Sequence, residues 1–484
     1  MSETRPLPAR RASTASRRTS RSPAPSGISS VRPFTQAAAE RLLSRVAGVA
    51  PVLGNAVDLL RDGAENYPAW LDAIAAATDE IDFENYIIRN DATGRRFADA
   101  LGARARAGVR VRLLYDWLGC LTTPQRFWRE LRLTGVEVRC FNRPRLDSPF
   151  GWFSRNHRKT LRADSVGFVA GLCVGDVWSG TDGVDPWRDT GVRLRGPVVA
   201  ALAYAFEGSW THAGGAATAA APVTLGPAGD VAVRVIDSRP ATMGLYRFDQ
   251  LIAGIARRTL WLTDAYFVGT TSYVQALCDA ARDGVDVRLL VPGASDIPVA
   301  KALSRAGYRP LLEAGCRVFE WNGPMLHAKT AVADGRWARI GSSNLNLASW
   351  MGNWELDVAI ENEGFAGKLA AMFERDLQDA TEIVLDLGRI RAPDRTRPSL
   401  PWRRGSPGRL AAGAIGLGST VRAAITNHRA LGPAEARVTG AGGAILFLIA
   451  IILVAVPQML TIPLAVVATW LAVTLLIRAW RLRR

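Results

Sequence analysis

A pattern of alternating helix and strand signals occurs twice in the chain, and it constrains the fold more than any other feature. In the first copy, an alanine-rich segment from Ala69 precedes the apolar stretch IDFENYII (81–88) and the segment FADALGARARAGVRVRLLYD (97–116). The periodicity predicts helix, strand, helix and strand, with Gly108 ending the second helix. This order is typical of a βαβ unit, in which parallel strands are joined by a helix.

The second copy follows about 176 residues later. There LWLTDAYFV (260–268) precedes VQALCDAARDGVDVRLLVPG (274–293), and Gly284 takes the place that glycine has in the first copy. The period is far too long for a solenoid repeat. We therefore expect an α/β protein with two homologous halves, 62–215 and 225–391, packed as one bilobal catalytic unit.

Each half also carries one copy of the motif H-x-K-x4-D. The whole chain has only four histidines and four lysines, so composition alone explains two copies poorly. Alternate residues of an extended strand point to the same face, so each half would present an imidazole and an ammonium group together. Packing the halves face to face would bring two of each to one site. The motif residues are His157, Lys159, Asp164, His327, Lys329 and Asp334.

Two imidazoles and two ammonium groups suit the chemistry of a phosphodiester. The cations can hold the nonbridging oxygens, a neutral imidazole can attack phosphorus, and a protonated imidazole can give its proton to the leaving oxygen. This chemistry requires neither a metal nor a cofactor. A single H-x-K could equally be part of a solvent-exposed basic strand, so the prediction depends on the duplication.

With these motifs in place, the sequence resembles the phospholipase D superfamily and, within it, the bacterial cardiolipin synthase-like branch. Besides the first motif, the resemblance rests on the segments ENYIIRND (84–91), AGVRVRLLYDWLG (107–119), WRDTGVRLRGPVV (187–199), DAYF (264–267), DGVDVRLLVPGASD (283–296), MLHAKTAVADGRWARIGSSNLN (325–346) and NWE (353–355). It implies a covalent phosphohistidine, ping-pong transfer and a lipid acceptor. Phosphatidylglycerol as that acceptor would yield cardiolipin and glycerol.

The resemblance also implies roles for residues outside the two H-x-K pairs. Asn344 belongs to the G-S-x-N turn, whose amide helps to hold the phosphate, and Glu355 matches a carboxylate that orients a catalytic imidazole. Asp189 is the expected counterpart in the first half, and Asp185 is a weaker candidate. The motif aspartates look like scaffold residues. The expected catalytic set is therefore His157, Lys159, His327, Lys329, Asn344, Glu355 and Asp189.

The first half departs from the family pattern after its motif. The chain there is one residue shorter than usual, and Cys173 stands where the family typically has asparagine. A thiol is a weak hydrogen-bond donor, so we expect phosphate contacts to be shared unevenly among Lys159, Lys329 and Asn344.

The segments around the two halves differ in composition. Residues 1–33 are rich in Arg, Ser and Pro and predict a disordered basic tail, whose composition resembles a transit peptide. Residues 34–61 read as an amphipathic lead-in, and residues 392–436 as a basic linker. Five cysteines without CxxC spacing favour a reducing compartment over a disulfide framework or a zinc site.

Two uncharged apolar blocks make up residues 439–477, with prolines near their junction. One helix over this length would far exceed a hydrocarbon core of roughly 30 Å, so we expect a hairpin of two transmembrane helices. Arginines flank the pair on both sides, which places both ends and the catalytic domain on the cytoplasmic face of the cell membrane. A buried core hairpin is the alternative.

Three functions compete at this point. A membrane phosphatidyltransferase acting on a phosphatidylglycerol-like lipid fits the apolar blocks and the net charge of +16, which favours anionic lipid. A phospholipase D hydrolase or a nuclease-like phosphodiesterase would use the same motifs, although the lipid-branch resemblance argues against nucleic acid. A catalytically weak, lipid-binding membrane protein would agree with the Cys173 departure but not with two intact H-x-K pairs.

Overall fold

The structure is a computed structural model that describes residues 36–144, 154–180, 185–217, 225–240, 242–385 and 469–470. The chain divides into two units, residues 1–41 and 42–484. Helix α1 (Gln36–Ala47) crosses this boundary, and every other element described below belongs to the second unit.

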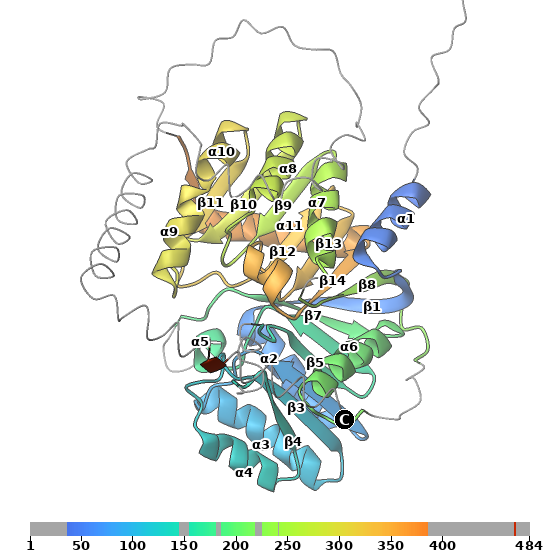
Figure 1. Ribbon diagram of the computed structural model, residues 1–484. Coiled ribbons are helices and arrows are strands. Elements are labelled where there is room, and N and C mark those ends of the chain that lie inside the picture. Colours follow the sequence, from blue (N-terminus) through green and yellow to red (C-terminus); the bar gives the residue numbers. More distant parts are fainter. Residues whose placement is uncertain are drawn as a thin grey trace, which may run out of the picture. The chain divides into compact units, whose positions relative to one another are not determined.

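A single mixed sheet runs through both halves of the second unit (Figure 1). In the described residues it has 15 strands in the order β15-β11-β10-β9-β12-β13-β14-β8-β1-β7-β6-β5-β2-β3-β4. The first seven strands in the chain are β1 (Val52–Arg61), β2 (Glu80–Asn85), β3 (Arg110–Asp116), β4 (Glu137–Phe141), β5 (Lys159–Ala163), β6 (Val166–Ala170) and β7 (Thr190–Arg195). The others are β8 (Val231–Ser238), β9 (Thr259–Thr263), β10 (Asp286–Pro292), β11 (Arg317–Trp321), β12 (Thr330–Ala333), β13 (Trp337–Gly341), β14 (Glu355–Glu361) and β15 (Ala380–Ile383).

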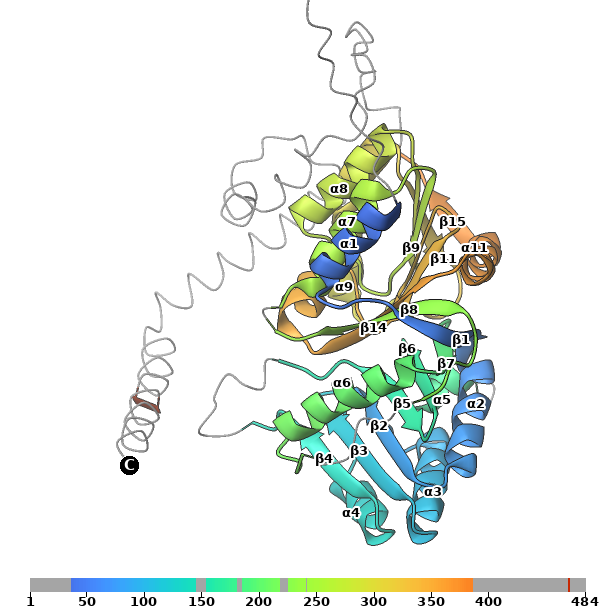
Figure 2. The ribbon, with the colours of Figure 1, turned by 90° about the vertical axis from the view of Figure 1, so that its right-hand side faces the viewer.

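Helices cover both faces of the sheet in each half (Figure 2). The first half contains α2 (Asp62–Ala76), α3 (Ala92–Arg106), α4 (Gln125–Leu133), α5 (Asp176–Ser179) and α6 (Val198–His212). The second contains α7 (Gly244–Ile255), α8 (Thr271–Arg282), α9 (Pro298–Ala306), α10 (Tyr308–Glu313), the π-turn η3 (Ala348–Gly352) and α11 (Glu363–Gln378). Helices α6 and α11 share one apolar core at the junction of the halves, whereas α2 and α3, like α7 and α8, pack in cores of their own half.

The duplicated pattern folds as two equivalent βαβ arrays, as the sequence predicts. Strands β2, β3 and β4 are parallel, and so are β9, β10 and β11. Gly108 and Gly284, which end the helices before β3 and β10, both have φ of 91°, where a side chain would be strained. The α/β architecture with two similar halves is therefore confirmed.

The sequence did not indicate how the halves are joined. Strand β1 pairs antiparallel with β8 of the second half and with β7 of the first, so the two sheets become one. The interval 34–61, expected to be an amphipathic lead-in, thus contributes α1 and this joining strand.

Most of the flanking predictions fall outside the described residues. These are the tail 1–33, the linker 392–436 and the hairpin 439–477, of which only residues 469–470 are described, as helix. Within the ranges that the structure describes, no helix has the length and apolarity needed to cross a membrane.

Candidate active site

The two H-x-K pairs lie at equivalent places in the two halves. His157 and Lys159 stand where β5 begins, and His327 and Lys329 stand where β12 begins. Strand β5 runs antiparallel to β2, and β12 runs antiparallel to β9. Both motifs therefore start at the edge where the parallel strands of their own half end, which is where α/β sheets place ligands.

Backbone hydrogen bonds between the halves fix the two histidines. The His157 N–H donates to the carbonyl of Trp354 at 2.9 Å, and the His327 N–H donates to the carbonyl of Arg188 at 2.7 Å. Trp354 and Arg188 directly precede the two carboxylates that the family resemblance singles out. Each histidine is thus tied to the strand start of the opposite half.

The carboxylates pair with the imidazoles in a crossed arrangement. His157 Nδ1 of the first half lies 3.0 and 3.1 Å from the carboxylate oxygens of Glu355 in the second. His327 Nδ1 of the second half lies 2.7 Å from Asp189 Oδ2 in the first. Asp185, the weaker candidate, is exposed, whereas Asp189 is fully buried. Both Nδ1 atoms thus face carboxylates, and Nε2 is the ring nitrogen of each histidine that does not.

The two lysines accompany the imidazoles in the interior. Lys159 and Lys329 are buried, and each ammonium group donates to the backbone carbonyl of the histidine in its own motif. Lys329 Nζ also lies 2.9 Å from His327 Nδ1, whereas Lys159 Nζ lies 5.3 Å from the ring centroid of Tyr86. Burial lowers the pKa of both lysines, that of Lys329 to about 8. One cation is therefore in direct contact with an imidazole and the other is not.

Burial also holds both imidazoles toward the neutral form. It lowers the pKa of His157, an effect that Lys159 reinforces and Glu355 opposes. It also lowers the pKa of His327 well below its ordinary value, with added repulsion from Lys329 and Lys159. The two imidazoles are thus equivalent in position, but only that of His157 has a carboxylate that opposes the effect of burial among the main causes of its pKa shift.

The pKa values of the two carboxylates that face the histidines, Asp189 and Glu355, are shifted in opposite directions. Burial raises the pKa of Asp189 to about 6. Burial also acts to raise the pKa of Glu355, but His157, Lys159 and the Ser342 hydroxyl outweigh it, so that pKa is lowered. Ser342 Oγ donates to Glu355 at 2.6 Å, and Gly171 occupies the equivalent position beside Asp189. A side chain at Gly171 would collide with the Asp189 carboxylate, so this half cannot supply a matching hydroxyl.

Strand pairing also defines the position of Cys173. Each histidine and its carboxylate form a dyad. Ala170 and Gly341 end β6 and β13, and each pairs with the residue two places after the dyad carboxylate of its own half, Asp189 or Glu355. Counted from these two residues, Cys173 and Asn344 both come third. The first half is one residue shorter because its turn between β5 and β6 has two residues, whereas the equivalent turn between β12 and β13 has three. Cys173 therefore takes the structural place of Asn344.

Only one of these two positions offers a free polar group. Asn344 is 5% exposed, and its Oδ1 has no hydrogen-bond partner among the described residues. Its backbone N–H donates to Ser349 Oγ at 3.2 Å, and Asp264 holds the next amide, that of Leu345, at 2.8 Å. Cys173 is 1% exposed, and burial raises the pKa of its thiol. The equivalent loops thus present an amide in the second half and a neutral thiol in the first.

The motif aspartates lie away from this site. Asp164 accepts the backbone N–H groups of Thr78, Asp79 and Glu80, and Asp334 accepts equivalent groups in the second half. Both stand at the far end of their strand from the histidine, with φ near 50°. A five-residue strand separates the two ends by roughly 16 Å, so these carboxylates act on the scaffold.

Sequence reasoning missed Arg188, which lies directly behind the second dyad. Its guanidinium is buried and donates to Asp376 of α11 at 2.7–3.0 Å and to Asp62 at 3.0 Å. It also donates to the backbone carbonyl of Asp189. The only signal was its place in the W-R-D-T segment, next to Asp189.

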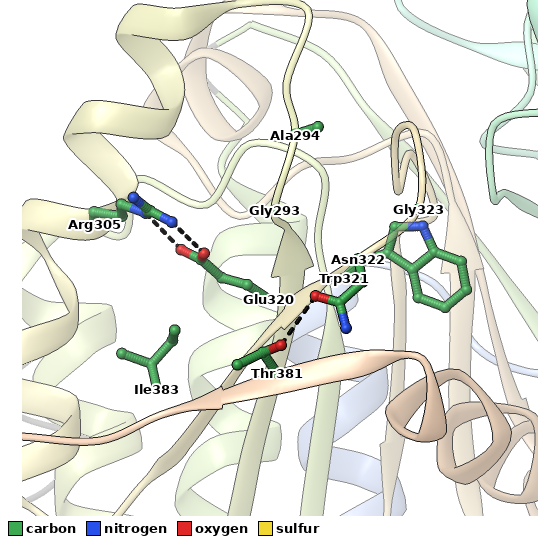
Figure 3. Close-up of a pocket in the computed structure, with 9 residues that line it drawn as sticks. All are labelled: Gly293, Ala294, Arg305, Glu320, Trp321, Asn322, Gly323, Thr381 and Ile383. Carbon is green, nitrogen blue, oxygen red and sulfur yellow. Dashed lines mark hydrogen bonds and ion pairs between the residues drawn. The ribbon is translucent and has the colours of Figure 1, made fainter.

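One cavity in the second half lies apart from the motif residues. It has a volume of about 450 Å³ and lies beside β11 and β15 (Figure 3). Its charged groups, Arg305 and Glu320, pair with each other. Within the described ranges, no group of three or more His, Cys, Asp or Glu side chains is arranged to hold a metal ion.

Comparison with known proteins agrees with this geometry. A family model described as "Cardiolipin synthase, PLD-like domain" matches residues 70–173 and 251–377. The chain is 34% identical over 364 residues to a cardiolipin synthase of Alkalihalophilus pseudofirmus, covering 72% of each chain. It is 35% identical over 357 residues to cardiolipin synthase A of Pseudomonas aeruginosa, covering 71% of each. With the major cardiolipin synthase ClsA of Bacillus subtilis it shares 32% identity over 340 residues, covering 67% of this chain and 69% of the relative.

A solved structure shares the fold. The crystal structure of phosphatidylserine synthase from Haemophilus influenzae superposes with a TM-score of 0.56 and 15% identity, covering 73% of this chain and 94% of that one. The curated relatives match about two thirds of the chain or more, and the residues matched by the family model contain both H-x-K motifs. The protein therefore belongs to the cardiolipin synthase family of phospholipase D-like enzymes.

Proposed function

We propose that the protein joins two phosphatidylglycerol molecules into cardiolipin and releases glycerol. Membership of the cardiolipin synthase family supports this reaction. The observation that carries the proposal is the crossed pairing, in which His157 meets Glu355 and His327 meets Asp189. Two buried imidazoles, each oriented by a carboxylate through Nδ1, are what a double displacement at phosphorus requires.

In the first step, one Nε2 attacks the phosphorus of the donor lipid. The phosphorus–oxygen bond to the glycerol headgroup breaks, and the second imidazole gives its Nε2 proton to the departing oxygen. Glycerol leaves, and the phosphatidyl group stays on the first histidine through a phosphorus–nitrogen bond.

In the second step, the imidazole that gave its proton acts as the base. It takes the proton from the terminal hydroxyl of the acceptor phosphatidylglycerol, whose oxygen attacks phosphorus as the phosphorus–nitrogen bond breaks. Cardiolipin forms, and both imidazoles return to their starting states.

Three groups are suited to the charge on the nonbridging oxygens. Lys159 and Lys329 supply positive charge in a site shielded from water, and the Nδ2 group of the buried Asn344 can donate a hydrogen bond. Because the thiol of Cys173 replaces the second amide, we assign the larger share of this contact to the second half.

We assign the attack on phosphorus to His327 and the first proton transfer to His157. Lys329 lies 2.9 Å from His327 Nδ1, which opposes protonation of that ring. Glu355 accepts hydrogen bonds from Ser342 and Asn353 as well as facing His157, so it stays ionised and opposes the effect of burial on the pKa of that ring.

We also propose that residues 439–477 hold the enzyme in the membrane as a hairpin with both ends in the cytoplasm. Support comes from the two uncharged blocks and from the arginines on either side of them. Such an anchor would keep the site beside the lipid headgroups.

The direct test is to incubate the purified full chain with phosphatidylglycerol vesicles and to follow the lipids by mass, with a nucleic-acid cleavage assay alongside. Cardiolipin and glycerol in equal amounts are expected. Phosphatidic acid instead of cardiolipin would identify water as the acceptor and a hydrolase as the function. Cleaved nucleic acid with unchanged lipid would indicate a nuclease, and no turnover at all would indicate a lipid-binding protein.

A further inference from the structure

Exposed apolar side chains gather in the loops at the edge of the sheet that carries both histidines. Among the described residues, ten large apolar side chains are exposed. Five of the ten lie in loops that follow β3, β9, β10 and β13, with exposed fractions between 36% and 60%. These are Leu118, Leu121, Val268, Ile297 and Leu347. Single exposed leucines are ordinary on protein surfaces, but a concentration of them around one site is not.

In the first half, this loop is tied to the catalytic histidine through a tyrosine. Leu118 and Leu121 flank a tight turn, in which the Leu121 N–H donates to the carbonyl of Leu118 at 3.2 Å. Gly119 in the turn lies so close to the backbone of Tyr86 that a side chain there would collide with it. The ring of Tyr86 in turn packs 4.8 Å from the ring of His157. Tyr86 is therefore the residue that connects the turn with the two leucines to the ring of His157.

The second half repeats this arrangement with Tyr266, whose ring lies 6.0 Å from that of His327. Asn346 Nδ2 donates to the carbonyl of Tyr266 at 3.0 Å, and Leu347 is the next residue. Asn346 also forms a β-bridge with Val268.

The remaining member of the group is attached to the same tyrosine. The Tyr266 hydroxyl donates to Asp296 at 2.7 Å, and Ile297 follows. All three apolar side chains of the second half are thus attached around the tyrosine that contacts its histidine.

We propose that these five side chains form a membrane rim, which sets the mouth of the active site against the surface of an anionic phospholipid bilayer. The inference rests on the proposed function, because a site that cuts lipid headgroups must face the layer that contains them. Small apolar tips on separate loops suit shallow insertion between lipids. Positive charge lies close by, since the exposed Arg89 lies 5.9 Å from the ring of Trp178, which packs 5.8 Å from His327.

The chain offers a matched control for this proposal. Leu53 in β1 and Leu133 at the end of α4 are exposed by 68% and 82%, more than any rim residue. Leu133 comes before β4, at the opposite edge of the sheet from the histidines. Removing these two leucines takes away as much exposed apolar surface without touching the rim.

The experiment compares two substrates for the full chain. One is phosphatidylglycerol in vesicles, and the other is dihexanoyl phosphatidylglycerol dissolved as single molecules. The rim variants are Leu118→Ser with Leu121→Ser, and Val268→Ser with Leu347→Ser; the control is Leu53→Ser with Leu133→Ser. Each rim variant should lose about tenfold of its turnover on vesicles and little on dissolved lipid, while the control changes neither.

Two activity results would overturn the proposal. Equal loss on both substrates would mean that the rim contacts the substrate molecule itself, and no loss on vesicles would mean that it does not meet the bilayer. If wild-type protein turned over neither lipid, the proposed function would fail, and the rim would be decided by a second measurement.

That measurement needs no activity. An environment-sensitive fluorophore on Leu121→Cys, in a Cys140→Ser background because Cys140 is the one partly exposed cysteine of the five, should shift to the blue with phosphatidylglycerol vesicles. The same label on Leu133→Cys should not. Identical responses at the two positions would refute insertion at the rim, and a response that follows protein concentration without vesicles would indicate contact with a second copy.

Discussion

The two dyad carboxylates should respond in opposite directions when their charge is removed. Asp189 is fully buried with a pKa of about 6, against an ordinary value of 3.8. A folded-state pKa above the unfolded one means that stability declines as pH rises from about 4 to about 6. A shift of about two units corresponds to roughly 3 kcal/mol at 1.36 kcal/mol per unit.

Asp189→Asn resembles the protonated aspartate and avoids that cost. At pH 7.5 we expect the variant to be more stable than wild type by about 2–3 kcal/mol, and at pH 4 to be equal to it. For a protein of this size, the difference corresponds to a rise in Tm of roughly 4 °C. Turnover should nevertheless fall about 10³-fold or more, because an amide leaves His327 poorly oriented and without its counter-charge.

Glu355→Gln is the matched variant with the opposite sign. The pKa of Glu355 is lowered in the fold, so its ionised form contributes stability above the unfolded pKa, and that stability is lost as pH falls through the folded value. We therefore expect Glu355→Gln to lower Tm at pH 7.5, with a similar loss of turnover. The interaction with His157 lowers the pKa of Glu355 most, and the hydroxyl of Ser342, which has no counterpart at Gly171 beside Asp189, adds to it.

The measurement is thermal unfolding of the full chain, followed by tryptophan fluorescence at a series of pH values from 4 to 7.5. This range stays below the pKa of Lys329, about 8, so most of the lysine remains charged. A destabilised Asp189→Asn at pH 7.5, or a stabilised Glu355→Gln, would refute this account of the asymmetry between the dyads.

Four further predictions concern the mechanism and the scaffold. His157→Ala and His327→Ala should each remove nearly all turnover, and with an activated leaving group only His157→Ala should still form a phosphohistidine, detected by mass; an adduct on His157 would reverse our assignment. Activity should persist in excess EDTA, and recovery of lost activity with added Mg²⁺ or Zn²⁺ would contradict this. Arg188→Met should cost about 3–5 kcal/mol in urea unfolding because it leaves the buried Asp376 with only its 3.3 Å contact to Arg61, whereas Arg126→Met at an exposed pair should cost less than about 1 kcal/mol. Reporters placed near residue 394 and after residue 484 should face the same side of the membrane, and opposite sides would exclude the two-span hairpin.

The sequence by itself determined the two α/β halves, the two H-x-K pairs and the choice of Cys173 as the departure from the family pattern. These features are local, because helix and strand periodicity and the spacing within a strand follow from neighbouring residues. Strand pairing then places Cys173 at the position in the first half that Asn344 has in the second, as the motif spacing already implied.

Only the tertiary structure decided which carboxylate meets which imidazole. The partners His157 and Glu355 are 198 residues apart, and His327 and Asp189 are 138 apart, so no local pattern specifies the crossed pairing. The pairing depends on β1, which joins the two sheets and so brings one half's carboxylate beside the other half's histidine. The difference in pKa between the two carboxylates also depends on strand pairing, but within each half: the pairing of β13 with β14 brings Ser342 to Glu355, and that of β6 with β7 brings Gly171 to Asp189.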